Sequence, residues 1–364
     1  MTVNEIAKSL ESWAPLAYQE SYDNSGLLVG SPDMTIKGVL ISLDCTEAVV
    51  DDAISKGCNM IVSHHPLIFG SLKRLTGANH VERTVIKALK NDIALYAIHT
   101  NLDNVHNGVN RRIAERLELT GTSILAPKKG LLKKLVVFCP HDNVENLRQS
   151  IFEAGAGAIG DYDECSFNLK GEGTFRGAEG SDPFVGEPGK QHSEPETRVE
   201  VIFQSPKEKA ILAAMIDAHP YEEVAYDIYQ LDNFDQTKGA GMIGKLSVPM
   251  EEEAFLRRLK DRMNTGCVRH TPLRNKNIET VAVCGGSGSF LLGTAKGAGA
   301  DVFITGDFKY HDFFHAEGDI IIADIGHYES EQFTIDLLLE YLCEKFSDIS
   351  VHATTVNTNP IQYL

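Results

Sequence analysis

The sequence predicts an α/β protein, because its first and last thirds alternate apolar strands with amphipathic helices. The strands are continuous apolar runs, which are typical of mostly parallel sheets that helices cover. The middle of the chain has a different order of elements and includes a long segment rich in glycine, proline, serine and glutamate. The length of 364 residues fits about two domains of ~150 residues each.

Strands and helices alternate through the first third of the chain. Thr46 is placed to cap the first helix, and Gly57 to end it. The predicted strands are 36–44, 59–63 and 92–98, and the predicted helices are 47–56, 81–91 and 110–119.

The last third also alternates strands and helices, and its first strand is followed by a glycine-rich loop at 285–289. Backbone N–H groups of such a loop could hold a phosphate, or the loop could be a tight strand-to-helix turn. It lacks the P-loop lysine and the full dinucleotide spacing. The predicted strands are 280–284, 301–305, 320–324 and 350–353, and the predicted helices are 291–299, 309–316 and 330–345.

The middle segment predicts a unit of another type. Its order of strand, helix, two strands, helix and strand suggests a ferredoxin-like unit. The segment 177–197 between its strands has few apolar residues and is predicted to be a loop. The predicted strands are 134–138, 173–176, 198–203 and 224–231, and the predicted helices are 144–154 and 207–218.

Charge and cysteine content exclude several classes of protein. With 34 basic and 51 acidic side chains the net charge is −17, which argues against a nucleic-acid partner. The seven cysteines are odd in number and show no CxxC pair, so we expect neither a disulfide framework nor a thiolate zinc site. We expect no signal peptide and no membrane span, and therefore a cytoplasmic location.

The residues that carry chemistry follow the ends of predicted parallel strands. Ligand sites of open α/β sheets lie at the carboxyl ends of the strands, so these side chains should meet at one edge. His327 and Glu331 are four residues apart and should share a helix face. The predicted metal ligands are His64, His65, Asp103, His327 and Glu331.

Imidazoles and carboxylates without thiolate suit zinc, iron, manganese or cobalt, and we favour two divalent cations, with zinc first. If the chain turns at Pro66, His64 and His65 can reach two neighbouring ions, which Asp103 or Glu331 could bridge. Two ions would lower the pKa of a bound water towards ~7 and hold a polar substrate. Each motif also has a plain structural explanation, such as packing of the histidine pair, a first-turn Glu331 or a helix-capping Asp103.

Further polar residues lie near the same strand ends. His99 could be an acid or base, a partner of the metal ligands, or a core histidine with its hydrogen bonds satisfied. We take Glu331 and His99 as the catalytic candidates. Asp23 could lie near the site or only form a turn, and the 309–311 segment could meet an anionic substrate or only begin a helix.

Five segments of the chain resemble the GTP cyclohydrolase I type 2 homologs of the NGG-interacting-factor type. Tyr22 stands where that family commonly has tryptophan. The motifs are YDNSGLLVG at 22–30, SHHPLIF at 63–69, HTNLDNVHNGVN at 99–110, TGDFKYH at 305–311 and GHYESE at 326–331.

The resemblance implies a discontinuous core of two similar α/β halves, residues 1–126 and 241–364, with two metal ions between them. It assigns the metal ligands to the same five residues that the strand ends indicated. It also implies a toroidal homohexamer, a trimer of dimers, with its metal sites facing the inner cavity. Residues 127–240 look like the inserted domain of longer bacterial members, similar to PII and CutA proteins, which would cap or gate the ring.

The function that the resemblance implies is a metal-dependent hydrolase, nominally a GTP cyclohydrolase that opens the purine ring at C8. Phosphoester or amide hydrolysis fits a two-metal centre equally well. The alternative is a metal-stabilised ring whose insert binds an effector or partner. A nucleic-acid-interacting protein is the third hypothesis, which the net charge of −17 disfavours.

Overall fold

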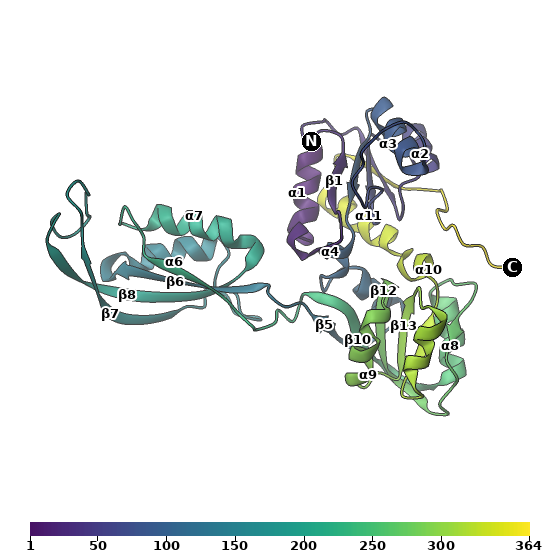
Figure 1. Ribbon diagram of the computed structural model, residues 1–364. Coiled ribbons are helices and arrows are strands. Elements are labelled where there is room, and N and C mark those ends of the chain that lie inside the picture. Colours follow the sequence, from purple (N-terminus) through teal and green to yellow (C-terminus); the bar gives the residue numbers. More distant parts are fainter. The chain divides into compact units, whose positions relative to one another are not determined.

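The computed structural model describes all 364 residues and shows a mixed α/β protein with several sheets and eleven α-helices (Figure 1). The chain divides into two compact units. The first combines Met1–Pro127 with Gln236–Leu364, and the second is Lys128–Asp235. The first unit contains two sheets, and the second contains one.

The first sheet has five strands in the order β1-β4-β3-β2-β15. The strands β4, β3, β2 and β15 run parallel, whereas β1 pairs with β4 in the antiparallel sense. Helices α2 and α3 cover one face. The bounds are β1 (Gly26–Val29), β2 (Gly38–Ser42), α2 (Glu47–Ser55), β3 (Met60–Ser63), α3 (His80–Lys90), β4 (Ala94–Ala97) and β15 (Ser350–Ala353).

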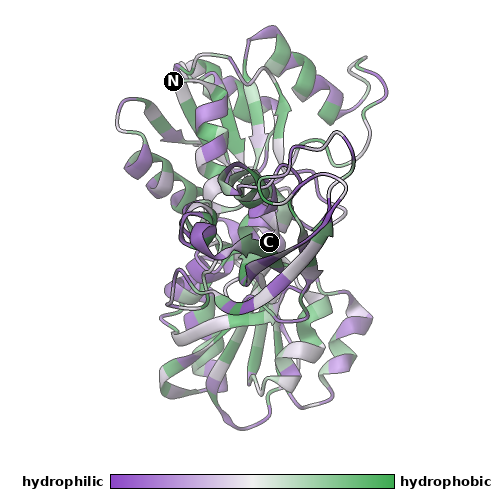
Figure 2. Cartoon of the chain, turned by 90° about the vertical axis from the view of Figure 1, so that its left-hand side faces the viewer, coloured by the Kyte–Doolittle hydropathy of each residue, from purple (hydrophilic) through white to green (hydrophobic).

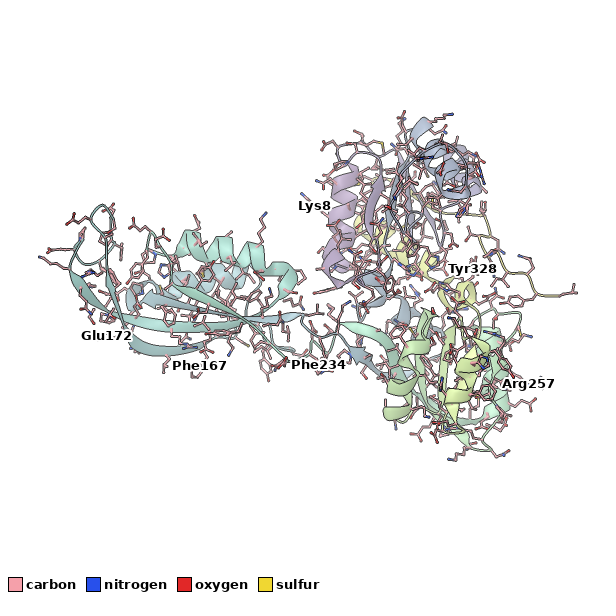
Figure 3. All side chains as sticks on the ribbon, viewed as in Figure 1. Lys8, Phe167, Glu172, Phe234, Arg257 and Tyr328 are labelled. Atoms are coloured by element: carbon pink, nitrogen blue, oxygen red, sulfur yellow. The ribbon has the colours of Figure 1, made fainter.

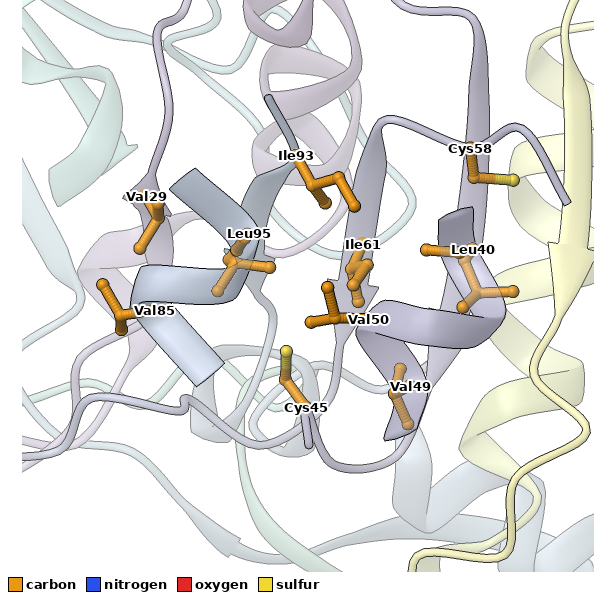
Figure 4. Close-up of a cluster of buried hydrophobic side chains, with 12 residues drawn as sticks. Val29, Leu40, Cys45, Val49, Val50, Cys58, Ile61, Val85, Ile93 and Leu95 are labelled. Carbon is orange, nitrogen blue, oxygen red and sulfur yellow. The ribbon is translucent and has the colours of Figure 1, made fainter. Parts of the chain in front are cut away.

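Apolar side chains of these parallel strands form the core beneath the two helices (Figure 4). Leu40, Ile61 and Leu95 come from adjacent strands, and Val50 and Val85 come from α2 and α3. Asn79 caps α3 by accepting a hydrogen bond from the Glu82 N–H at 2.9 Å. The continuous apolar strands of the sequence therefore reflect burial on both faces.

The second sheet has six strands in the order β11-β14-β13-β12-β10-β5. Only its centre, β12, β13 and β14, is parallel, and the outer strands pair antiparallel. The bounds are β5 (Thr120–Pro127), β10 (Gly239–Glu251), α8 (Glu252–Arg262), β11 (Arg269–His270), β12 (Asn277–Ser287), α9 (Leu292–Gly297), β13 (Val302–Gly306), the 3₁₀ helix η5 (Tyr310–Ala316) and β14 (Ile321–Asp324).

Helices near the two ends of the chain pack against each other. On α1 (Val3–Trp13), the ring of Trp13 stacks on Tyr341 of α11 (Thr334–Lys345), with 4.3 Å between ring centroids. Two further helices, α4 (Thr100–Asp103) and α5 (Val109–Arg116), lie between the sheets in the sequence.

The prediction of one continuous helix at 330–345 is wrong, because the structure has two separate helices there. The structure has a short α10 (His327–Glu331) and a separate α11, with Gln332 and Phe333 between them. Gln332 donates a side-chain hydrogen bond to the Met263 carbonyl, and the Arg116 guanidinium lies 4.0 Å from the centroid of the Phe333 ring. These tertiary contacts accompany the break.

The second unit is built in the order β6, α6, β7, β8, α7, β9, the order of a ferredoxin-like unit. Its antiparallel sheet has the order β7-β8-β6-β9, and Leu135, Val201 and Ile211 lie in the core between sheet and helices. Figure 3 labels Phe167 and Glu172 on the long β7 strand. The bounds are β6 (Leu132–Pro140), α6 (Val144–Glu153), β7 (Phe167–Arg176), β8 (Gln191–Gln204), α7 (Glu208–Ala218) and β9 (Tyr226–Gln230).

The loop predicted at 177–197 is also too long. β8 begins at Gln191, where it pairs with Arg176 of β7. The residues 191–196 are mostly polar because that end of the hairpin is largely exposed, so they carry no apolar strand pattern.

Hydropathy follows this architecture in Figure 2, where hydrophobic colour concentrates on the strands and the helices carry hydrophilic residues. None of the helices combines the length and the apolar character that crossing a bilayer requires.

A matched pair of isoleucine substitutions tests this core. Ile61 is fully buried in the first sheet, whereas Ile54 on α2 is 43% exposed. Ile61→Ala should lower the free energy of unfolding by about 2–5 kcal/mol, because it removes buried methyl groups and leaves a cavity. Ile54→Ala should change it by about 1 kcal/mol or less. Urea denaturation measures both, and equal effects would contradict the packing.

Candidate metal centre

The ends of the parallel strands bring the candidate residues together. After β3 ends at Ser63 the chain turns, and the backbone N–H groups of His64 and His65 donate to the carbonyls of Ser42 and Leu43. From the second sheet, β14 is followed by Gly326, which precedes α10 and has a positive φ of 95°. α10 carries His327 and Glu331. Imidazoles and carboxylates from both sheets of the first unit thus meet in one cluster.

His64 is completely buried, and a hydrogen bond at its Nδ1 fixes the ring. Its Nδ1 lies 2.8 Å from the carbonyl oxygen of Ile98, so Nδ1 carries the proton and donates. Its Nε2 then faces Asp103 Oδ1 and Glu331 Oε1, each at 3.7 Å. Both separations exceed a hydrogen bond.

His65 and His327 converge on the same carboxylate. Glu331 Oε2 lies 2.9 Å from His65 Nε2 and 3.1 Å from His327 Nε2. The two Nε2 atoms are only 3.3 Å apart. These three polar atoms lie within 4.8 Å of one another. The Glu331 side chain that brings them together is 97% buried.

Two groups of three side chains share Glu331. One is His65, His327 and Glu331, and the other is His64, Asp103 and Glu331. In each group the ligand-type atoms lie within 4.8 Å of one another. A third group joins His99 to His64 and His65. The sequence-predicted residues are therefore all in one cluster.

Two buried atoms of this cluster have no hydrogen-bond partner, namely His64 Nε2 and Asp103 Oδ1. A buried polar atom without a partner is costly, and such atoms are few in folded proteins. A lone pair on a deprotonated imidazole nitrogen and a carboxylate oxygen are both donors to a divalent cation. The residues therefore fit a metal ion.

Two of the histidines form hydrogen bonds to aspartates through their Nδ1 atoms. Asp44 Oδ1 lies 2.8 Å from His65 Nδ1, and Asp307 Oδ2 lies 2.7 Å from His327 Nδ1. Such carboxylates fix the ring and the tautomer of metal-binding histidines. The sequence does not single out Asp44 and Asp307, although each follows a parallel strand, as the predicted ligands do.

Asp23 holds His99 in the same way. Asp23 Oδ1 lies 2.8 Å from His99 Nδ1, while Oδ2 accepts hydrogen bonds from the backbone and side chain of Thr100. Burial opposes the charge on Asp23, but its bonds to His99 and Thr100 outweigh burial and hold the pKa of this carboxyl well below its usual range. Asp23 therefore lies at the site, and it is ionised.

The electrostatics of the cluster are those of a metal-free site. Burial lowers the pKa of His65, but its contacts with Asp44 and Glu331 outweigh burial and raise the pKa to about 9. Burial is likewise outweighed at His327, where Asp307 and Glu331 raise the pKa to about 11. Burial and the neighbouring Glu331 raise the pKa of Asp103 to about 7. Protons thus occupy positions that a cation would take.

The glycine-rich loop leaves space for the Glu331 side chain, and its glycine N–H groups are not free to bind a phosphate. The N–H groups of its three glycines are already used, since Gly285 donates to Asn110 Oδ1, Gly286 to Ser330 Oγ and Gly288 to Thr305 Oγ1. A Cβ on Gly286 would overlap Glu331 Oε1, and the residue has a φ of +63°. Glycine is therefore required for the carboxylate to reach its place.

The cluster opens into a pocket of about 970 Å³ in the first unit. His65, His99, Asp103, His327 and Glu331 all line this pocket. Cys284 also lines it, but burial, with Asp103 and Glu331, raises the pKa of its thiol, so it stays protonated. The segment 309–311 is not part of the pocket wall.

Fold and cluster together define an α/β protein whose carboxylates and histidines, at the strand ends of two sheets, can hold metal. Sequence comparison makes the class specific. The Duf34/NIF3 (NGG1p interacting factor 3) family profile matches residues 1–360, and the chain belongs to this family.

Relatives and solved structures agree with the assignment. The chain is 38% identical to proteins named GTP cyclohydrolase 1 type 2 homolog from Bacillus subtilis and Halalkalibacterium halodurans, over 99% of this chain and 98% of each relative. The crystal structure of a Bacillus cereus protein related to NIF3 is similar, with a TM-score of 0.85, 37% identity, and coverage of 100% of this chain and 99% of that one. Staphylococcus aureus protein SA1388 follows with a TM-score of 0.80, 32% identity and the same coverage.

Metal uptake should release protons, because His65 and His327 hold protons in the metal-free protein. Their folded pKa values exceed the unfolded value near 6.5. Protonation therefore stabilises the metal-free fold fully below pH 6.5, and this stabilisation is lost as the pH rises through about 9 and then about 11. Zinc affinity should rise over the same interval. Titration calorimetry in buffers of different ionisation enthalpy measures the released protons, and a pH-independent affinity without proton release would contradict the assignment.

Substitution of Gly286 tests the packing of Glu331. Gly286→Ala should displace the Glu331 carboxylate, weaken zinc binding by at least about tenfold and destabilise the protein. Gly293→Ala on α9 is the matched control, because its Cβ would meet no atom within 4 Å. Zinc titration of the two variants makes the comparison. Unchanged affinity in Gly286→Ala would show that Glu331 does not need this space.

Proposed function

We propose that this protein is a metal-dependent hydrolase with a dinuclear centre held by His64, His65, Asp103, His327 and Glu331. The observation that carries the proposal is the pair of three-residue groups that share only Glu331. Two cations, zinc first, would each take one group, with Glu331 as the bridge. The orphaned His64 Nε2 and Asp103 Oδ1 support the second position.

When bound, such a pair of cations lowers the pKa of water and stabilises negative charge that develops on a substrate. The chain supplies the rest. Asp44 and Asp307 orient the rings of His65 and His327. Glu331 is held among three imidazoles, which keep its pKa well below the ordinary value, so it is an anionic ligand. Burial opposes this ionisation, and the contacts with the three histidines outweigh burial.

His99 is the proposed proton carrier of the pocket. Asp23 holds the proton on His99 Nδ1, which leaves Nε2 on the other side of the ring as an acceptor. Its ring is in edge contact with Phe69 and with the ring of His65, with centroids 5.6 Å and 5.4 Å apart. A histidine fixed in this way beside the cluster can take a proton from water and return it to a leaving group.

The names of the relatives suggest a nominal substrate, GTP, and hydrolytic opening of its purine ring. We propose hydrolysis as the reaction class and GTP as its nominal substrate. A two-metal centre can also hydrolyse other polar bonds, so the pocket wall must decide among them.

A second candidate function is effector binding by the second unit. This unit has its own pocket of about 660 Å³. Four aromatic residues line it, namely Phe138, Phe175, Phe184 and Tyr221. The Tyr221 ring is centred 6.1 Å from Phe175 and 6.2 Å from Phe184. The buried Glu196 accepts a hydrogen bond of 2.9 Å from the Tyr221 hydroxyl. Such a pocket suits a small molecule and supports a regulatory role.

We further propose that residues 127–240 are a PII/CutA-like inserted domain and that the chain forms a toroidal, cytoplasmic homohexamer, a trimer of dimers. The element order of the second unit and its antiparallel sheet support the first proposal. Light scattering of the purified protein measures its mass, and a monomer at micromolar concentration would contradict the hexamer.

Elemental analysis and turnover separate the two functions. The protein should carry about two zinc ions per chain and turn over a substrate only when loaded. Glu331→Gln should lower metal content and reduce turnover by more than about 100-fold, because even residues behind metal ligands contribute 10–100-fold. Glu344→Gln, on the exposed side of α11, is the matched control. Bound metal without turnover of nucleotides, phosphodiesters and amides would favour the regulatory function.

A further inference from the structure

The mouth of the metal-centre pocket is lined by apolar side chains that are exposed to solvent. They come from four separate segments of the first unit. The exposed fractions are 66% for Tyr22, 53% for Phe69, 37% for Leu72, 69% for Phe290 and 50% for Ile361. Exposed large apolar residues that gather on one pocket mark a surface that binds something apolar.

The segment after β15 contributes one side of this mouth. Thr358 donates its hydroxyl to Asp44 Oδ2 at 2.6 Å, and the Asn359 side chain donates to Glu329 Oε1 at 2.9 Å. These two bonds tie the segment to both sheets, and Pro360 and Ile361 form the wall beyond them. The apolar side of the pocket is therefore anchored to the residue that orients His65.

Apart from the histidines of the cluster, the charged side chains of the pocket wall are acidic. Glu20, Asp44, Asp103 and Glu331 line it, whereas its 35 lining residues include neither lysine nor arginine. The basic residues that follow Leu72 in the sequence, Lys73 and Arg74, are exposed and lie outside the wall. The four carboxylates offset the charge of the two divalent cations in the proposed centre.

A nucleoside triphosphate is a poor match for such a wall. Its phosphates carry several negative charges, which proteins meet with metal ions, arginine, lysine or unoccupied backbone N–H groups. Here the charge of the two proposed cations is already offset by the four carboxylates of the wall. The glycine-rich loop offers none of its three bonded N–H groups, as described above. A neutral molecule with an apolar body meets the aromatic mouth without leaving a charge unpaired.

We propose that the substrate of this site is an uncharged acyl compound, an amide or an ester, with an aromatic or aliphatic body that packs against Phe69, Phe290 and Ile361. This inference rests on the proposed hydrolase function and narrows its substrate away from GTP. Water adds its oxygen to the acyl carbon, and the bond from that carbon to nitrogen or oxygen breaks. The leaving atom receives one proton of the water, and the other proton is released as the new acid ionises. The other product is a carboxylate.

Binding of matched compounds to the zinc-loaded protein tests this substrate class. N-(4-nitrophenyl)butyramide is neutral, and 4-nitrophenyl phosphate has the same ring with a charged group. Guanosine and GTP make a second pair that shares one base. Calorimetry should show the neutral member of each pair binding at least about tenfold more tightly. The metal-free protein should show the same order of affinities, because the wall belongs to the chain.

Three phenylalanine variants localise the binding. Phe290→Ala and Phe69→Ala should each weaken binding of the butyramide by about fivefold or more, because each removes a ring from the mouth. Phe314→Ala is the matched control, since Phe314 is 65% exposed on η5 and is not part of the wall. All three side chains are more than half exposed, so the variants should remain folded.

Tighter binding of GTP than of guanosine would overturn the inference, above all if Lys73→Ala or Arg74→Ala removed the difference. Failure of both neutral compounds to bind at millimolar concentration would also overturn it. Preferred binding of the neutral compounds without turnover of any of them would instead retain the pocket assignment and contradict the hydrolase function. Turnover of GTP with weak binding of neutral compounds would support a hydrolase and reject the substrate class.

Discussion

The arrangement of the first unit depends on how the charge of the buried Glu331 carboxylate is compensated. Burial of an ionised carboxyl is costly unless cations or hydrogen-bond donors surround it. Here His65 of one sheet and His327 of the other reach the same oxygen, at 2.9 Å and 3.1 Å. Without metal, raised pKa values keep protons on these imidazoles. The contact between the two sheets therefore depends on the same histidines and carboxylate that form the candidate metal site.

Most of the site was predictable because of one topological rule. Side chains that follow parallel strands meet at one edge of a sheet, and histidines or acids in those positions are conspicuous in the sequence. The rule found His64, His65, Asp103, His327 and Glu331, and it applies equally to Asp44 and Asp307. Those two were missed because a single aspartate after a strand is common, and only its distance to a ring nitrogen distinguishes it. The role of Gly286 depends on the path of Glu331 in space and has no signal in the sequence.

The fold was predictable where strands are buried on both faces. The sequence did not reveal the antiparallel strands β1, β5 and β10. β1 has only four residues, and glycine and polar residues interrupt the apolar runs of β5 and β10. It placed one helix at 330–345, since the break at Gln332 and Phe333 depends on contacts with Met263 and Arg116. The hairpin of β7 and β8 extends well beyond its apolar core, so composition alone described its polar end as a loop. Tertiary contacts decide each of these cases.

The two units divide the chemistry of the chain. The first combines a carboxylate and imidazole cluster with an apolar mouth, and the second holds an aromatic pocket around Tyr221. The central claim is that the cluster binds two metal ions bridged by Glu331. Anomalous diffraction above the zinc edge, from crystals grown with zinc, tests it most directly. We expect two peaks, one beside His65 and His327 and the other beside His64 and Asp103, with the Glu331 carboxylate between them. No peak at this cluster, or a single peak that leaves His64 and Asp103 without metal, would contradict the dinuclear account.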